Sequence, residues 1–166
     1  MAICRDRPTS SSPEPDDDPP MTSSASAQPS ASEQIAEIID TFELLGDWDQ
    51  RYEYLVEIGE KLTPMDPAAK TDSNLVKECM STVHVAPSPD GNGQLSYQGD
   101  CDTAIIKGVV ALLVGLFSDK TPAEIEALDV DELFTGLQLE EHLSPNRHVG
   151  VYAIVNKMKG QAQAFA

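Results

Sequence analysis

The residues that decide the fold are VHVAPSPDGNGQLSYQGDCDTAIIKGVVALLVGLF, at positions 83–117. A segment rich in Val and Thr, 76–86, leads into turn-forming residues at 87–93, and a short strand follows at 94–98. This pattern predicts a β-hairpin. Asp102 is then expected to cap a helix that runs to residue 117 and is apolar around most of its circumference. Such a helix is typical of the buried centre of a domain.

Helix signals precede this stretch. Ser30 and Glu33 have capping-box spacing, and the apolar residues after them repeat at helical spacing until Gly46 stops them. Asp47 and Gln50 repeat the cap spacing before a second amphipathic helix. We expect these two helices to form an antiparallel pair.

Helix signals also follow the central stretch. Thr121, Pro122 and Glu124 satisfy the rules for a capped short helix, a further helix is expected near 131–137, and the Ser-Pro pair at 144–145 opens the last one. The order of helices, hairpin and helices predicts an α+β fold. In it, a small antiparallel sheet packs against several helices in a single domain.

The first thirty residues differ in composition from the rest. They hold six of the twelve prolines and seven serines, with few sizeable apolar groups. Such a segment cannot bury enough apolar surface to offset the entropy of ordering it. We therefore expect a disordered tail at 1–30 and a domain at 31–166. The sequence is compatible with a start at either Met1 or Met21.

The charge balance excludes several classes of protein. With 28 acidic against 11 basic residues, the net charge is −17, which repels nucleic-acid phosphates and anionic lipids. The longest apolar run, 104–117, is too short for a membrane span. Three cysteines give no disulfide framework, and no signal or transit peptide is evident. These features predict a cytoplasmic protein that binds neither nucleic acid nor membrane.

Two thiols stand out. Cys79 lies where a polar loop passes into a strand, so its thiol can reach the surface. Its neighbour Glu78 disfavours the thiolate by charge repulsion, while Lys77 favours it. Cys101, just before the central helix, reads as a small hydrophobic residue. Because a helix N-terminus lowers a thiol pKa, a secondary redox role is the alternative reading of Cys101.

The histidines do not point to a metal site. Zinc binding by Cys79, His84 and Cys101 is disfavoured because residues 79 and 84 point to opposite faces of a regular strand. No second metal-binding pair accompanies them. His142 and His148 flank the start of the last helix and read as surface residues. We therefore expect no metal and no cofactor.

Two carboxylates and one arginine complete the candidates. Asp100 and Asp102 bracket Cys101 as a catalytic pair would, but helix capping by Asp102 is the favoured explanation. Arg147 lies in the first turn of the last helix, where a cation opposes the helix dipole. This position predicts a carboxylate or a protein partner for Arg147.

Several segments together resemble the SufE cysteine-desulfuration proteins, which are sulfur acceptors for iron–sulfur cluster assembly. The similarity covers essentially all of 33–164, and its specificity lies in the order and spacing of short matches. These are DW at 47–48, RY at 51–52, IG at 58–59, NLV at 74–76, CMSTV at 79–83, QGDCD at 98–102, IIKG at 105–108 and LSPNR at 143–147.

The resemblance implies that Cys79 is the persulfide-accepting cysteine. Three departures from the family pattern surround it: Glu78 replaces the usual Gly, His84 replaces a frequent Trp, and Cys101 replaces a common Ser. The last of these leaves open a second acceptor or an inhibitory Cys79–Cys101 disulfide. The residues expected to support the site or bind a partner are Asp102, Arg147, Lys107, Glu78 and His84.

The function that the resemblance implies is sulfur transfer. A pyridoxal-phosphate-dependent, SufS-like cysteine desulfurase supplies persulfide sulfur to Cys79, and the chain passes it to a SufB-containing scaffold. The chain would then be a carrier that stimulates the desulfurase, without a cofactor of its own, rather than a stand-alone enzyme. Two other functions fit the same residues: a non-catalytic adaptor of a desulfurase, and a redox-sensing protein that uses Cys79 and Cys101.

Overall fold

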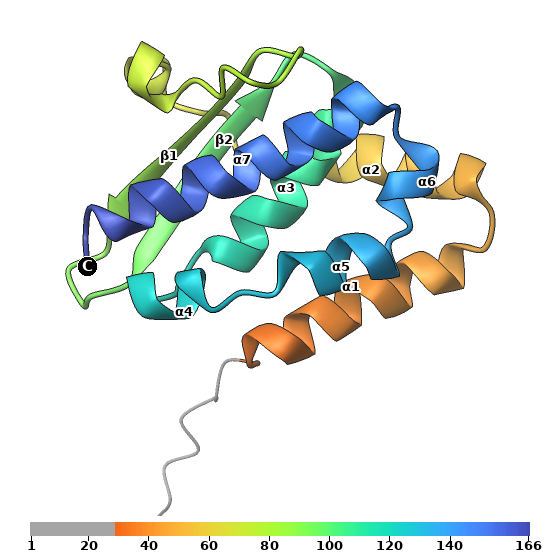
Figure 1. Ribbon diagram of the computed structural model, residues 1–166, viewed down its shortest axis with the longest axis horizontal. Coiled ribbons are helices and arrows are strands. Elements are labelled where there is room, and N and C mark those ends of the chain that lie inside the picture. Colours follow the sequence, from red (N-terminus) through yellow and green to blue (C-terminus); the bar gives the residue numbers. More distant parts are fainter. Residues whose placement is uncertain (1–28) are drawn as a thin grey trace, which may run out of the picture.

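The computed structural model describes residues 29–166, so the predicted tail lies outside the described residues apart from its last two. Within these residues, seven helices, two short 3-10 turns and one antiparallel hairpin form a single domain (Figure 1), which confirms the predicted α+β fold. In chain order the elements are α1 (Ala31–Leu45), α2 (Trp48–Glu60), η1 (Pro67–Ala69), η2 (Asp72–Asn74), β1 (Val83–Pro89), β2 (Leu95–Cys101), α3 (Ala104–Phe117), α4 (Pro122–Glu126), α5 (Val130–Gly136), α6 (Leu139–His142) and α7 (Pro145–Gln163).

Helix α3 is the centre of the domain, as its apolar circumference predicts. It contacts β2 and α7 as well as α1 and α2. Its closest neighbour is α2, because a Cβ at Gly108 would collide with the carbonyl oxygen of Leu55. The predicted pairing of α1 with α2 is a smaller contact. It includes the Phe42 and Tyr54 rings, with centroids 5.6 Å apart, and a hydrogen bond from Arg51 Nε to Phe42 O over 2.9 Å.

The hairpin is confirmed, but its bounds differ from the prediction. Ladder pairs run from Val83 opposite Cys101 to Pro89 opposite Leu95, so both strands lie further along the chain than expected. Residues 76–82 leave the ladder because Val76 N donates to Val83 O over 2.8 Å and closes a loop. Pro87 and Pro89 are tolerated in a strand that has only one partner strand.

The caps explain most helix starts. Both predicted capping boxes, at 30–33 and 121–124, are formed, and Asp47 accepts a hydrogen bond from the Gln50 amide. The predicted cap of α3 is wrong: Thr103 is the N-cap residue and makes no side-chain cap bond. The carboxylate of Asp102 is instead engaged with the loop before β1, as described below.

The two faces of the hairpin have different neighbours. The inner face carries Val83, Val85, Tyr97 and other buried side chains, and it packs against α3 and α7. The η1 segment is tied to the outer face, where Lys70 reaches Asp100 over 2.6 Å. Within residues 29–166, none of the helices combines the length and the apolar character that crossing a bilayer requires.

Candidate functional site

The Cys79 thiol lies on the closed loop 76–82, directly before β1. Its amide donates to Val76 O over 3.4 Å, and its side chain is half-buried against the hydrophobic core. The next residue, Met80, is 82% exposed. The predicted position of Cys79 at a loop edge, with access to the surface, is therefore what the structure has.

The end of this loop is fastened to the end of β2. Thr82 N donates to Asp102 Oδ1 over 3.0 Å, and Asp102 N donates back to Thr82 O over 3.3 Å. The hydroxyls of Ser81 and Thr103 lie 2.7 Å apart. Asp102 thus supports the Cys79 loop, as the resemblance implies, although by a different contact from the helix cap that its sequence position predicts.

Helix α7 forms the other wall of the site. A Cβ at Gly150 would lie 2.9 Å from Cys79 Sγ, so the thiol rests directly against the helix. Arg147 lies one turn earlier on α7 and is exposed. Within residues 29–166 no carboxylate lies within salt-bridge distance of Arg147, so the first of the two predicted partners, a carboxylate, is not found in that part of the chain.

Glu78 faces a shallow hollow beside the same helix. The hollow measures about 300 Å³, and its other walls are Ala153, Asn156 and Lys157. The loop therefore follows the surface of α7 for about two turns. Glu78 brings a negative charge to the rim of the site, as its sequence position predicts.

Cys101 is more deeply buried than Cys79. It is buried, and burial raises its pKa to about 11, although a hydrogen bond from Thr103 N opposes the shift. The charges of Asp102, Cys79 and Asp100 raise it further. The lowering expected from a helix N-terminus is therefore wrong, because Cys101 ends a buried strand. Both thiols are free.

The remaining two candidates, Lys107 and His84, lie beside Asp100 of β2. Lys107 Nζ is 3.4 Å from Asp100 Oδ1, and Lys70 holds the other carboxylate oxygen. Partial burial raises the pKa of Asp100, but hydrogen bonds from both lysines outweigh it and lower the pKa. His84 is the cross-strand partner of Asp100.

The structure therefore divides the predicted site residues into two groups. One group surrounds Cys79, and the other surrounds Asp100. The strand argument against a zinc site does not apply to Cys79, which lies on a loop before β1. His84, however, alternates with Val83 along β1, so its side chain points away from Cys101. Among the described residues, no three His, Cys, Asp or Glu side chains gather as metal ligands would.

Sequence reasoning missed two features of α7 and the segment before it. The first is the contact of Gly150, for which a glycine inside a helix is the one visible signal. The second is a stack of His142 on Trp48, with ring centroids 3.9 Å apart and planes at 22°. Tyr52 also donates to the His142 carbonyl over 2.7 Å. His142 is therefore not a plain surface residue; it fixes the segment before α7 to α2.

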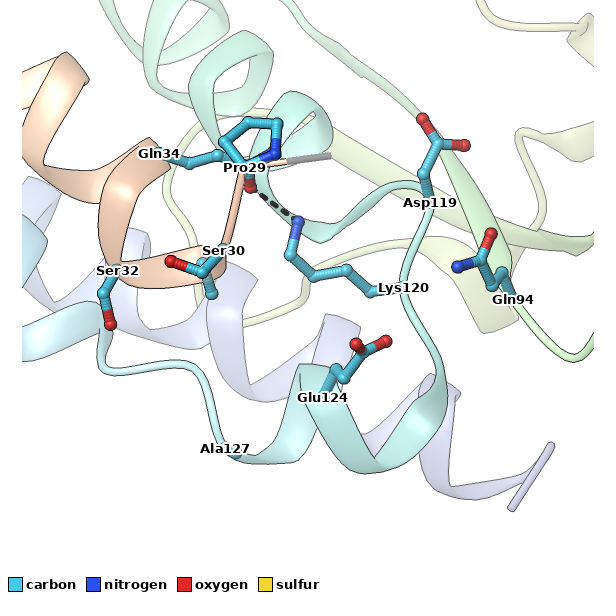
Figure 2. A pocket seen from close by; sticks show the side chains of 10 residues that line it. Pro29, Ser30, Ser32, Gln34, Gln94, Asp119, Lys120, Glu124 and Ala127 are labelled. Carbon is cyan, nitrogen blue, oxygen red and sulfur yellow. Dashed lines mark hydrogen bonds between the residues drawn. The ribbon is translucent and has the colours of Figure 1, made fainter. Parts of the chain in front are cut away.

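A hollow of about 620 Å³ lies at the opposite end of the hairpin from Cys79, between the start of α1 and α4. Lys120, the one buried charged residue of the described chain, donates to Gln34 there over 2.7 Å (Figure 2), and burial lowers its pKa. Asp119 and Glu124 also line the hollow. Lys120 serves to fasten α1 to the connection between α3 and α4, and no candidate thiol lies nearby.

Comparison with known proteins identifies the family of the chain and supports its fold. Residues 36–162 match the SufE family, described as an Fe-S metabolism associated domain. An uncharacterized SufE-like protein of Rhizobium meliloti is 33% identical over 132 residues, which are 78% of this chain and 94% of that protein. The solution structure of a hypothetical protein from Thermus thermophilus has the same fold, with a TM-score of 0.64 and 19% identity over 79% of this chain and 94% of that one. The chain thus belongs to the SufE family, whose domain is associated with iron–sulfur metabolism.

Proposed function

We propose that this protein accepts sulfur on Cys79 from the persulfide of a SufS-like cysteine desulfurase and delivers it to a SufB-containing scaffold. Membership of the SufE family supports a role in iron–sulfur metabolism. The observation that carries the finer assignment is the setting of Cys79. It is a free, half-buried thiol on a closed loop, beside an exposed methionine and against α7.

The transfer step needs only the groups that two proteins supply. The Cys79 thiolate attacks the outer sulfur of the donor persulfide, a new S–S bond forms on Cys79, and the donor cysteine leaves as a thiolate. Sulfur moves without net oxidation, so neither an oxidant nor a cofactor of this chain is required. A half-buried thiol suits this task because the loaded sulfur is then partly sheltered from other thiols.

The surroundings of Cys101 argue against the redox-sensor alternative. With its pKa raised to about 11, Cys101 is almost entirely protonated near neutral pH and is a poor attacking group. Its burial keeps it from an external persulfide as well. Cys101 is better explained as a small core residue beside the site than as a second acceptor.

The test is intact-mass analysis after incubation with a cysteine desulfurase and L-cysteine. We expect a gain of about one sulfur atom, mapped to Cys79 by peptide analysis, and its loss on treatment with a reductant. The Cys79→Ser variant should gain nothing while keeping its melting temperature, since a loop thiol contributes little packing. Cys101→Ser serves as the matched thiol control and should still load.

Two outcomes would redirect the assignment. If Cys79→Ser stimulates the desulfurase as strongly as the parent when the sulfur acceptor is limiting, the adaptor function is favoured. If sulfur appears on Cys101 of the folded parent, the single-acceptor proposal is wrong.

A further inference from the structure

We propose that Gly150, in the middle of α7, is a positioning residue for the Cys79 sulfur. Its missing side chain leaves the space in which Sγ lies against the helix and is partly sheltered from solvent. The inference rests on the proposed function for its biological meaning. Its geometric part, that Gly150 leaves room for the Cys79 thiol, is tested without any sulfur donor.

The helix itself gives no reason for a glycine at this position. Gly150 is not among the glycines with positive φ, so any L-residue can adopt its backbone conformation. Glycine is also among the poorest helix formers, and an interior position of a long helix favours almost every other residue. The explanation must therefore lie in the space around the residue.

Cys79 is the nearest neighbour of that space. The three heavy atoms nearest to a Cβ at Gly150 all belong to Cys79: Sγ at 2.9 Å and Cα and Cβ at 3.5 Å each. The last two distances are ordinary van der Waals contacts, whereas the first is shorter than real Cβ contacts allow. A methyl group at Gly150 thus conflicts with the sulfur and not with the rest of the loop.

The sulfur has limited ways to move aside. Both ends of its loop are fixed, one by the bond from Val76 to Val83 and the other by the paired bonds between Thr82 and Asp102. A methyl group at Gly150 would therefore turn the Cys79 side chain away from α7. Solvent is within reach of the displaced side chain, because Cys79 is only partly buried and the next residue, Met80, is exposed.

The same helix supplies a matched control. Gly160 is exposed, and a Cβ there would meet nothing within 4 Å. Gly160→Ala therefore changes the helix propensity of α7 in the same way as Gly150→Ala but adds no contact with the thiol. A difference in melting temperature or thiol reactivity between the two variants therefore reports the contact of the added methyl group with the Cys79 thiol.

The first test is a thermal double-mutant cycle on the full chain. In the parent, Gly150→Ala should lower the melting temperature by roughly 3–8 °C, because it overpacks a tight site. In the Cys79→Ala background the same change should have no cost or should stabilise, since the conflicting sulfur is gone. Gly160→Ala should be neutral or slightly stabilising in both backgrounds.

An equal loss from Gly150→Ala in both backgrounds overturns the proposal, since the glycine would then serve some other contact. If Gly150→Ala does not fold, folding of the Cys79→Ala, Gly150→Ala double variant supports the proposal. Failure of the double variant as well overturns it.

The second test measures the thiol directly, by the rate at which iodoacetamide alkylates Cys79 in the folded protein. We expect Gly150→Ala to accelerate this reaction at least threefold and Gly160→Ala to leave it unchanged. An unchanged rate in a folded Gly150→Ala protein overturns the proposal. If the parent accepts no sulfur from a desulfurase but both tests give the expected results, the proposed function fails while the role of Gly150 stands.

Discussion

The two ends of the β1–β2 hairpin are each held by an aspartate, but the two aspartates act over very different distances in sequence. At the turn end, Asp90 Oδ1 accepts from the amides of Asn92 and Gln94, at 2.7 and 3.1 Å. At the loop end, Asp102 Oδ1 accepts from the Thr82 amide, twenty residues away, at 3.0 Å. The aspartate at the turn end bonds to residues close to it in the sequence, whereas the aspartate at the loop end bonds to a residue that is distant in the sequence.

Because of this difference, the two ends should affect the stability of the fold and the reactivity of the Cys79 thiol differently. The turn end is shaped by local residues, including Gly91 and Gly93 with φ of 86° and 87°. The loop end brings Cys79 to a place that β2 and α7 define together. Changes at either end should therefore alter stability, while only changes at the loop end should alter the thiol.

The largest expected contrast is between the two thiols of the loop end itself. Burial raises the pKa of Cys101 to about 11 against an ordinary value of 9.0, so at pH 8 its thiolate fraction falls roughly a hundredfold. Iodoacetamide should therefore label Cys79 in the folded protein and leave Cys101 almost untouched, as peptide mapping would show. Comparable labelling of both thiols would mean that the loop end opens readily in solution.

The aspartate pair gives the next contrast. Asp102→Ala and Asp90→Ala each remove side-chain bonds to backbone amides, so each should lower stability by about 1 kcal/mol, or about 2–4 °C. Only Asp102→Ala should change the alkylation rate of Cys79, by severalfold, because it releases the loop. A change of the Cys79 rate in Asp90→Ala would show that the two ends are not independent.

Gly93 tests the turn end alone. Its φ of 87° is strained for any residue with a Cβ, so Gly93→Ala should lower stability by about 1 kcal/mol. Thermal melts would give the loss, and sulfur loading of Cys79 should be unchanged. Gly160→Ala, on an open helix face, is the matched substitution that should not destabilise the protein.

The smallest effect concerns acid stability at Asp100. Hydrogen bonds from Lys70 and Lys107, opposed by partial burial, place its folded-state pKa below the ordinary 3.8. A lowered carboxyl pKa contributes stability that is complete above the unfolded-state value and is lost as the pH falls through the folded-state value. Asp100→Asn should thus be less stable than the parent at pH 7, and this difference in melting temperature should narrow below about pH 4. A constant difference from pH 7 to pH 3 would contradict the assignment.

Local patterns predicted much of this fold. The capping boxes at 30–33 and 121–124, the apolar central helix and the existence of the hairpin all depend on residues a few positions apart. The predicted start of β1 was wrong. Val and Thr favour a strand at 76–82, whereas the hydrogen bond from Val76 N to Val83 O closes a loop there.

The candidate site was less predictable because its contacts join distant residues. Asp102 stands in a helix-cap position in the sequence, but its carboxylate accepts a hydrogen bond from the distant Thr82 amide instead. Cys101 stands near a helix start, yet burial outweighs the helix dipole and raises its pKa. No local pattern tells that Gly150 lies beside Cys79, since seventy-one positions separate them in the sequence.

The stack of His142 on Trp48 gives the protein an intrinsic fluorescent reporter. Trp48 is the chain's only tryptophan, so its emission reports one place, the junction of α2 with the segment that leads into α7. Its indole is half-buried, with Tyr52 beside it and the Arg51 guanidinium 5.3 Å from the ring centroid. If a partner protein lifts the start of α7 from α2, the indole becomes hydrated and its emission shifts to longer wavelength. Titration of the unlabelled protein can thus follow docking at the start of α7 as it happens.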